Sequence, residues 1–402
     1  MKPSKSSNLS VVKVTKSTLM LSALGLLSMT SLQAKGADAT SAAEEIIAQA
    51  ELAAQPKVQI AILLDTSGSM EGLIEQAKSE LWSIVNTFNS ANKDGKAPQL
   101  EVALYEYGKQ SLNAESNWQQ CIVPFSNDLD LISEALFKLK TNGGDEYCGA
   151  VIERAVADMK WDEAAGTYKA IFIAGNEPFT QGPINVTQSC QSAKKKGIVV
   201  NTIHCGNQQV GVQSGWNIGP VVAGGSLLTI DHNAQVTHID APQDKVIIQL
   251  NIDLNKTYVP YGKSGAKNKI RQEEQDSNAL QKESSGANVQ RAICKSSHNY
   301  SNTSWDLVDA AKQKQFDWGT VEKKDLPESM QKLSNKELQS YVADNAKKRT
   351  QIQLKIQNAS QERQKYIAKI SLEKSEDGAQ TLDQVVIETV RKQAKELGYT
   401  FK

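Results

Sequence analysis

Short apolar stretches alternate with amphipathic stretches between residue 58 and about residue 262. The apolar stretches have the length and aliphatic content of buried strands. Six such strands are expected: VQIAILL, QLEVALYEY, WQQCIVPF, YKAIFIA, GIVVNTIH and SLLTID. Between and after these strands, apolar residues recur at helical spacing, which predicts helices over Leu73–Asn89, Leu129–Leu139, Gly149–Met159, Val186–Lys196 and Gln243–Asn255. This alternation predicts an α/β fold: a doubly wound, mostly parallel sheet with helices on both faces.

One edge of this sheet is expected to be antiparallel. The second and third strands are joined only by GKQSLNAESN. A connection of this length is too short for a crossover helix, so the two strands should form a hairpin. The third strand then lies antiparallel at one edge of the sheet.

The N-terminus has the pattern of a secretory signal peptide. A basic region comes first, with Lys2, Lys5, Lys13 and Lys16. It is followed by the apolar core TLMLSALGLLSM and by SLQA, whose small residues allow cleavage after Ala34. The apolar core is too short to span a bilayer, since a transmembrane helix needs about 20 residues. We therefore expect an exported protein, periplasmic or secreted, without an integral membrane segment after cleavage.

The chain changes character beyond Tyr261. The segment KSGAKNKIRQEEQDSNALQKESSGANVQ is polar and charged, and NTSWDLVDAAKQ should hold a short helix capped by Asn302 or Ser304. Two further helices are expected over Leu333–Lys374 and Leu382–Leu397. The sequence thus divides into a signal peptide (1–34), a linker (35–57), an α/β domain (58–262) and an α-helical C-terminal region (263–402).

The long C-terminal helix carries an apolar seam at three- and four-residue spacing. The seam consists of Leu338, Val342, Ala346, Ile352, Ile356, Ala359, Tyr366 and Ile370. It fits either a helical hairpin that folds back on its own chain or an intermolecular coiled coil. Arg349 and Arg363 interrupt the seam and weaken a coiled coil, so the hairpin is the favoured interpretation.

Net charge and the absence of catalytic motifs argue against two functional classes, nucleic-acid-binding proteins and enzymes. The 402 residues include 45 basic and 45 acidic side chains, so the formal net charge is zero. Such a chain is not drawn electrostatically to nucleic acid, and no nucleic-acid partner is expected. The sequence also lacks a nucleophile elbow, a phosphate-binding loop with lysine and a zinc-protease helix motif, so we do not expect an enzyme.

Export makes the five cysteines candidates for disulfides. Cys190 and Cys205 flank one helix-to-strand unit, Cys121 and Cys148 flank another, and Cys294 is left over. Such spacings do not encode connectivity, and free buried cysteines remain the alternative. The favoured pair is Cys190 with Cys205, because the helix that carries Cys190 should run antiparallel to the strand that ends beside Cys205.

The turn after the first strand combines one carboxylate with two hydroxyls. In AILLDTSGSMEG, Asp65, Ser67 and Ser69 follow the buried strand, and Gly68 lets the backbone turn closely. In open α/β sheets ligands bind at this end of the strands. Small, hard divalent cations prefer oxygen ligands, so the motif predicts a Mg²⁺ site, with Mn²⁺ or Ca²⁺ as alternatives. The simpler interpretation is that these residues only form a turn and cap the next helix.

With this loop, residues 58–262 resemble the von Willebrand factor A family, whose metal-ion-dependent adhesion site has the pattern D-x-S-x-S. The expected strand order, antiparallel edge included, is the one that this resemblance implies. The family's second loop, usually two glycines and then threonine, corresponds to TNGGDEYCG. The resemblance therefore implies a cation bound by Asp65, Ser67, Ser69 and, at the threonine position, Asp145.

The third loop departs from the family's pattern. The usual TDGEP corresponds to AGNEP, so Gly175 replaces the aspartate and Asn176 replaces the glycine. One carboxylate is lost here while Asp145 adds one in the second loop, so the net charge of the site would be preserved. Thr141, just upstream of the glycines, is a weaker candidate ligand.

These features predict an exported, metal-dependent protein-binding module that serves adhesion or assembly. As the resemblance implies, an unidentified protein partner would present an acidic side chain that completes the coordination of the cation. A metal-assisted hydrolase is an alternative, with Glu146 and Glu177 as the nearby candidates for a general base. A third hypothesis makes the C-terminal helices a scaffold and the A-type domain structural.

Overall fold

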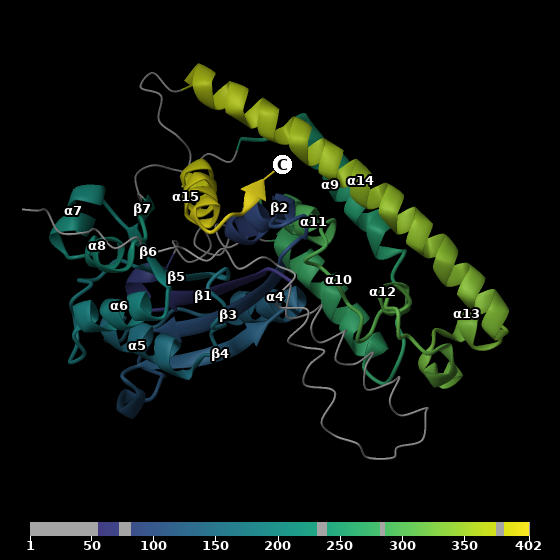
Figure 1. Cartoon of the computed structure of the whole chain (residues 1–402), viewed down its shortest axis with the longest axis horizontal. Helices are drawn as coiled ribbons and strands as arrows, with labels where there is room; N and C mark the ends of the chain where they lie inside the picture. Colours follow the sequence, from purple (N-terminus) through teal and green to yellow (C-terminus); the bar gives the residue numbers. More distant parts are fainter. Residues whose placement is uncertain (1–54, 72–81, 231–238, 282–285, 375–381, 402) are drawn as a thin grey trace, which may run out of the picture. The chain divides into compact units, whose positions relative to one another are not determined.

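Six of the apolar stretches form one sheet, whose elements are labelled in Figure 1. Its strands are β1 (Lys57–Asp65), β3 (Gln99–Tyr107), β4 (Gln119–Ser126), β5 (Tyr168–Gly175), β6 (Val199–Cys205) and β7 (Leu227–Ile230). They lie in the order β4-β3-β1-β5-β6-β7, and only the pair of β3 with β4 is antiparallel. The computed structural model thus confirms the predicted mostly parallel α/β fold with an antiparallel edge strand.

The structure describes residues 55–71, 82–230, 239–281, 286–374 and 382–401. The predicted signal peptide (1–34) and all but the last three residues of the linker (35–57) lie outside the described residues. The expected helix over Leu73–Asn89 is described only from residue 82, where it is helical up to residue 87.

Twelve helices are labelled in the described part of the chain (Figure 1). They are α4 (Leu129–Lys138), α5 (Cys148–Asp158), α6 (Val186–Lys195), α7 (Gln208–Gln213), α8 (Ile218–Ala223), α9 (Pro242–Asn255), α10 (Gly265–Gln281), α11 (Gly286–Lys295), α12 (Leu307–Ala310), α13 (Glu328–Gln331), α14 (Asn335–Lys374) and α15 (Leu382–Glu396). Two short strands, β2 (Ala91–Asn92) and β8 (Thr400–Phe401), pair with each other in a separate antiparallel ribbon.

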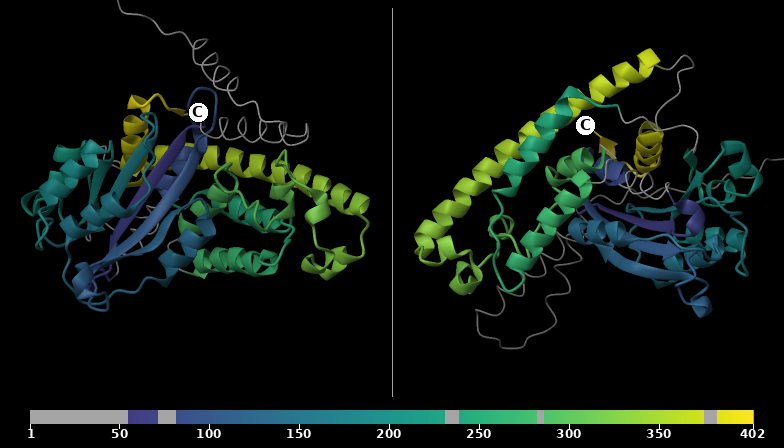
Figure 2. Two further views of the ribbon diagram at one scale, coloured as in Figure 1. Left: turned by 60° about the horizontal axis from the view of Figure 1, so that its bottom comes forward. Right: turned by 180° about the vertical axis from the view of Figure 1, so that it is seen from behind.

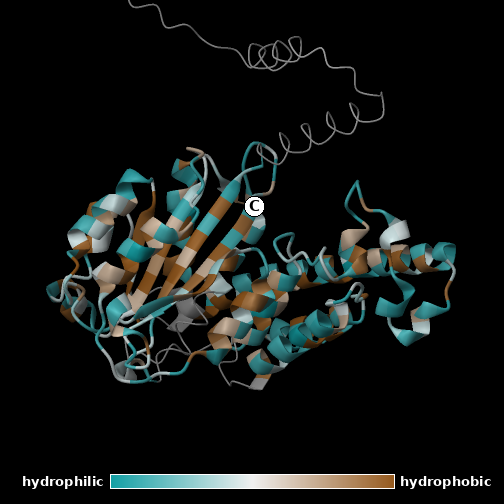
Figure 3. Ribbon diagram, turned by 90° about the horizontal axis from the view of Figure 1, so that it is seen from below, coloured by the Kyte–Doolittle hydropathy of each residue, from teal (hydrophilic) through white to brown (hydrophobic). Residues whose placement is uncertain are grey.

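Both faces of the sheet are buried. Successive residues of β1 alternate between two apolar clusters: Ile60 and Ile62 belong to one cluster, and Ala61 and Leu63 to the other. Figure 3 shows the hydrophobic stretches along the strands that supply both clusters. We call these clusters the first-face core and the second-face core.

Helices of the α/β segment cover the second face. The second-face core takes side chains from α5, α6 and the segment around Trp216. Helix α5 packs against α6, and α6 against α8. This half of the molecule follows the crossover pattern that the sequence predicts.

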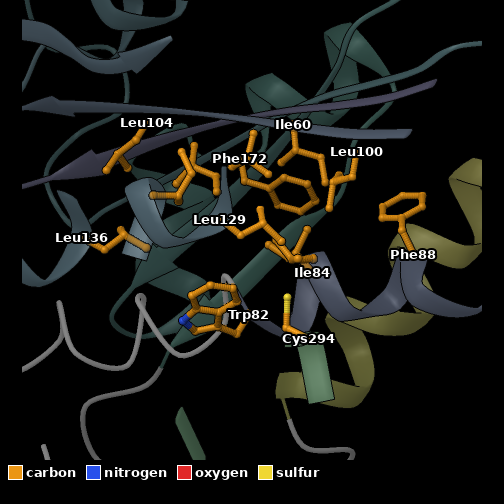
Figure 4. Packing of buried hydrophobic residues seen from close by; sticks show 14 of the residues in the cluster. Ile60, Trp82, Ile84, Phe88, Leu100, Leu104, Leu129, Leu136, Phe172 and Cys294 are labelled. Atoms are coloured by element: carbon orange, nitrogen blue, oxygen red, sulfur yellow. The ribbon is translucent and has the colours of Figure 1, made fainter. Parts of the chain in front are cut away.

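Segments from far along the chain help to cover the first face. Figure 4 shows Cys294 of α11 packed with Trp82 and Ile84 below the sheet. Helix α15 adds Val386 and Val390 to the same core, both fully buried. Elements from both sides of the sequence division at residue 262 therefore share one core.

Helices α10 and α11 were not predicted, because their sequence is polar and charged. Three of their charged side chains, Asp276, Arg291 and Lys295, are nevertheless buried or nearly so. Arg291 pairs with Asp130 of α4 and with Asp276, at N–O distances of 2.7 Å, and Lys295 pairs with Asp276 at 2.6 Å. Burial lowers the pKa of Lys295 to about 8, although Asp276 opposes this shift. These buried ion pairs, together with the apolar side chains of Val289 and Cys294 on α11, hold the two helices in place.

The long helix α14 packs back on its own chain, and Figure 2 shows it running alongside α9. The two arginines that interrupt its apolar seam are buried. The guanidinium of Arg349 pairs with Asp306 at 2.6 Å and with Asp309 at 2.9 Å, and its carbon lies 3.9 Å from the ring centroid of Tyr258. Arg363 pairs with Asp244 of α9 at 2.6 Å. The arginines therefore attach the helix to its own chain.

The cap of α12 corrects one prediction. The side chain of Asp306, and neither Asn302 nor Ser304, caps this helix by accepting a hydrogen bond from the backbone N–H of Asp309. The same carboxylate binds Arg349, so one aspartate fixes both α12 and α14.

The predicted disulfide is wrong, since all five cysteines are free. Cys190 lies in the second-face core, whereas Cys205 lies in the first-face core. The sheet therefore separates the two sulfur atoms. Both cysteines were expected near the same end of the sheet, but local sequence does not specify which face of the sheet Cys205 occupies.

Within the described residues, none of the helices is both long enough and apolar enough to cross a membrane.

Replacing Arg349 with alanine should strongly destabilise the fold. The substitution leaves Asp306 and Asp309 buried without their cation, and breaking a buried ion pair in this way costs about 3–5 kcal/mol. The free energy of unfolding, measured by urea denaturation, checks the expectation. Lys348→Ala on the exposed side of the same turn is the matched control and should change little. Equal stabilities of the two variants would contradict the role assigned to the buried pair.

Candidate metal centre

The predicted ligands lie where the parallel strands end. Asp65 is the last residue of β1 and is paired in register with Tyr107, the last residue of β3. Gly175, at the end of β5, is paired with His204 of β6. The segments that follow β1, β3 and β5 therefore leave the sheet at one edge, as the sequence predicts.

The first loop brings its three polar side chains together. After Asp65 the chain forms a short 3₁₀ helix, η1 (Gly68–Met70), which the buried side chain of Met70 anchors. The backbone N–H of Ser67 donates to Oδ1 of Asp65 at 2.7 Å. The hydroxyl oxygens of Ser67 and Ser69 lie 2.9 Å apart, and Ser69 is exposed. One carboxylate and two hydroxyls thus converge within a single turn.

Asp65 is a buried carboxylate with an unsatisfied oxygen. Its side chain is fully buried, and Oδ2 has no hydrogen-bond partner among the described residues. The pKa of Asp65 is raised to about 7: burial is the main cause, hydrogen bonds from Ser67 oppose the rise, and the nearby Glu146 and Glu177 contribute to it. An unpaired buried anion is costly, so this position favours either a proton or a bound cation.

The second loop lies directly against the first. The backbone N–H of Asn142 donates to the carbonyl of Thr66 at 3.0 Å. Asp145 follows in the same loop, but its side chain is exposed and hydrogen-bonds to Tyr147. The structure thus brings Asp65, Ser67 and Ser69 together and places Asp145 on the neighbouring loop, where its role as a ligand stays a prediction.

Glu146, the next residue of this loop, is buried. The pKa of Glu146 is raised to about 7, mainly by burial and in smaller part by the charges of Glu177 and Asp145. From the sequence, Glu146 was expected only as a candidate general base. Its position beside the first loop depends on tertiary packing. The sequence carried one signal, because two acidic residues, Asp145 and Glu146, follow the glycine pair and either one could turn inward.

The third loop contacts the first through an amide instead of a carboxylate. The hydroxyl of Ser69 donates to Oδ1 of Asn176 at 3.0 Å. Gly175 is enclosed: a Cβ atom at this position would lie 2.6 Å from the hydroxyl of Tyr107, 3.0 Å from the Trp216 ring and 3.1 Å from Oδ2 of Asp65. The glycine that departs from the family's pattern is therefore required by the packing around it.

The donor set fits a hard divalent cation. The described residues contain no group of three or more His, Cys, Asp or Glu side chains that could hold a metal ion. A cation at this edge would instead rest on the Asp65 carboxylate, the two serine hydroxyls and water. Such an all-oxygen set suits Mg²⁺, Mn²⁺ or Ca²⁺ better than a metal that prefers nitrogen or sulfur.

Replacing Gly175 with alanine should destabilise the domain by about 1–3 kcal/mol, the usual cost of overpacking. The added methyl group would collide with Tyr107 and Trp216. Thermal or urea unfolding measures the effect. Gly143→Ala is the matched control, because nothing lies within 4 Å of a Cβ atom at that position. An unchanged stability for Gly175→Ala would show that this edge of the sheet is loosely packed.

The family model described as the von Willebrand factor type A domain matches residues 59–212. None of the curated proteins matches the chain in sequence. Among solved structures, the SpRpn10 VWA domain is 18% identical over 45% of this chain and 90% of its own, with a TM-score of 0.35.

Two further solved structures show similar values. BatB from Bacteroides thetaiotaomicron is 15% identical over 43% of this chain and 90% of its own, with a TM-score of 0.33. Proximal thread matrix protein 1 from the mussel byssus was solved with a zinc-occupied MIDAS motif. It is 16% identical over 45% of this chain and 43% of its own, with a TM-score of 0.33.

The family-model match and the strand order with its antiparallel edge together lead to one conclusion: residues 59–212 form a von Willebrand factor type A domain.

Proposed function

We propose that this domain binds a divalent cation, preferably Mg²⁺, through Asp65, Ser67 and Ser69, and that the bound cation recruits a protein partner. The observation that carries the proposal is the buried Asp65 carboxylate, whose Oδ2 has no hydrogen-bond partner among the described residues. A cation at this position would supply the missing charge and connect the carboxylate to the two hydroxyls. Asp145, on the adjacent loop, is a further candidate ligand.

Charge and exposure together favour an acidic partner. With Asp65 as the only protein carboxylate on the cation, half the charge of a divalent ion is neutralised and the loaded site would retain positive charge. Ser69 and Gly68 are exposed, so that charge would be reachable from outside the domain. An acidic side chain of a protein partner would supply both the missing charge and an oxygen ligand.

We propose that the protein acts outside the cytoplasm, in the periplasm or after secretion. The N-terminal pattern of lysines, apolar core and small residues supports export. A binding role is favoured over an enzymatic one because the sequence carries no recognised nucleophile motif.

A metal-assisted hydrolase is the second candidate function. The observation that favours it is the burial of Glu146 beside the first loop, which raises the pKa of its carboxyl to about 7 and would suit a general base. Metal-dependent turnover of phosphate or carboxylate esters that is lost in Glu146→Gln would favour this candidate over binding alone.

Replacing Asp65 with alanine should abolish cation binding at this site, since it removes the buried charge. Isothermal titration with Mg²⁺ and Mn²⁺ compares the variant with the native protein. Glu153→Ala, which removes an exposed carboxylate from α5, is the matched control and should bind like the native protein. Equal affinity of Asp65→Ala and the native protein would reject the site.

Cation binding should also depend on pH with a definite sign. Because the pKa of Asp65 is raised to about 7 in the metal-free protein, a proton competes with the cation below that pH. The apparent affinity should therefore rise about tenfold per pH unit up to about pH 7 and then level off. The raised pKa also means that metal-free protein loses stability as pH increases through this range, so added cation should stabilise more at high pH. An affinity independent of pH would contradict a buried Asp65 ligand.

The partner and the cation should strengthen each other's binding. If a partner carboxylate occupies a coordination position, each ligand must raise the affinity of the other by the same factor, typically about 5- to 150-fold. Capture of proteins from envelope extract, followed by surface plasmon resonance on any partner found, measures this coupling with and without chelator. Asp65→Ala should mimic the effect of chelator. Binding that is indifferent to both would place the interface elsewhere, and the C-terminal helices would then be tested by deletion.

A further inference from the structure

We propose that Glu146, rather than its neighbour Asp145, supplies the second protein carboxylate of the cation site. This inference rests on the proposed function and extends it, because it changes the charge that the protein itself offers to the cation. It is carried by the position and burial of Glu146 and by the contrast with the other buried carboxylates in the described chain, which have basic partners.

Gly108 shows how closely Asp65 and Glu146 approach. This glycine has a φ of +83°, a conformation that other residues rarely adopt. A Cβ atom on Gly108 would lie 2.7 Å from Oδ1 of Asp65 and 2.9 Å from Cγ of Glu146. Oδ1 of Asp65 and the side-chain stem of Glu146 therefore border the same small space, which the glycine leaves open between them.

The two carboxylates have no basic partner. Within the described part of the chain, neither Asp65 nor Glu146 forms an ion pair. The amide of Gln181 donates to the Glu146 carboxylate over a long distance of 3.5 Å. Glu146 is only 7% exposed. Two like charges held together away from water repel each other unless a cation lies between them.

Elsewhere the same chain pairs its buried carboxylates with cations. Asp130 is bound by Arg291, Asp306 by Arg349, and Glu106 by Lys109. The arrangement at the edge of the sheet is therefore an exception to how this protein treats buried charge. A divalent cation there would give these carboxylates the positive partner that they lack. Oδ2 of Asp65, which is buried and has no hydrogen-bond partner in the described residues, is available to bind it.

Asp145 is less suited to this role. Its side chain is exposed and hydrogen-bonds to Tyr147, so water already solvates its charge. A solvated carboxylate gains less from a cation than a buried one does. With Asp65 and Glu146 as ligands, the protein would neutralise both charges of the cation, and a partner's carboxylate would add coordination rather than compensate charge.

The matched pair of variants Glu146→Gln and Asp145→Asn tests the assignment, because each removes one charge from adjacent positions and keeps the shape of the side chain. Isothermal titration of the full mature chain with Mn²⁺ at about pH 8 should show affinity lowered more than about tenfold in Glu146→Gln and changed by less than about threefold in Asp145→Asn. The reverse order, or equal effects, would overturn the inference.

Thermal unfolding gives a second readout that does not depend on cation affinity. In chelator at the same pH, Glu146→Gln should unfold at a higher temperature than the native protein, because it removes one of two repelling buried charges. A glutamate with a purely structural role would give a lower unfolding temperature, which would overturn the inference.

Asp65→Ala separates the two proposals. If it abolishes Mn²⁺ binding while Glu146→Gln does not weaken it, the cation site stands and the role of Glu146 is rejected. If Asp65→Ala binds Mn²⁺ normally, the proposed function itself fails, and the inference about Glu146 fails with it.

Discussion

The fold depends on one constraint: a sheet whose strands are apolar on both faces must be covered on both faces. Crossover helices of the α/β segment cover the second face. The first face is completed by parts of the chain that come much later, including Cys294 of α11 and Val386 of α15. A hydrogen bond also links the two ends of the described chain: the side-chain hydroxyl of Tyr399 donates to the backbone carbonyl of Lys57 at 2.7 Å. The C-terminal helices are therefore part of the core that supports the sheet.

Buried charge organises the helices that complete this core. Arg291 and Arg349 each lie between two aspartates in the interior. Because a buried charge without its partner is costly, these pairs tolerate few alternative arrangements of the helices that carry them. The helical region thus holds its position through specific ion pairs in addition to apolar contact.

The edge of the sheet with the candidate metal centre follows the opposite pattern. Asp65 and Glu146 are buried together without a basic side chain among the described residues, and Tyr107 and Trp216 pack so closely that Gly175 leaves no room for a third-loop carboxylate. Close packing around Gly175 holds this end of the strands in place. The buried carboxylates there carry negative charge that no neighbouring basic side chain among the described residues neutralises. That combination is what a preorganised cation site requires, since the donor atoms are held in place before the cation arrives.

Most elements of the sheet domain and the geometry of the first loop can be predicted from local sequence. Strands, crossover helices and the hairpin edge follow from local periodicity and connection length, and Asp65, Ser67 and Ser69 are joined by only a few bonds, so their convergence is a local property. Tertiary structure alone decided the rest. It placed Cys190 and Cys205 on opposite faces, buried the charges of α10 and α11, and turned Glu146 inward while Asp145 stayed exposed. These outcomes depend on partners far away in sequence, such as Gly108 for Glu146 and Asp306 for Arg349, and local pattern carries no information about such partners.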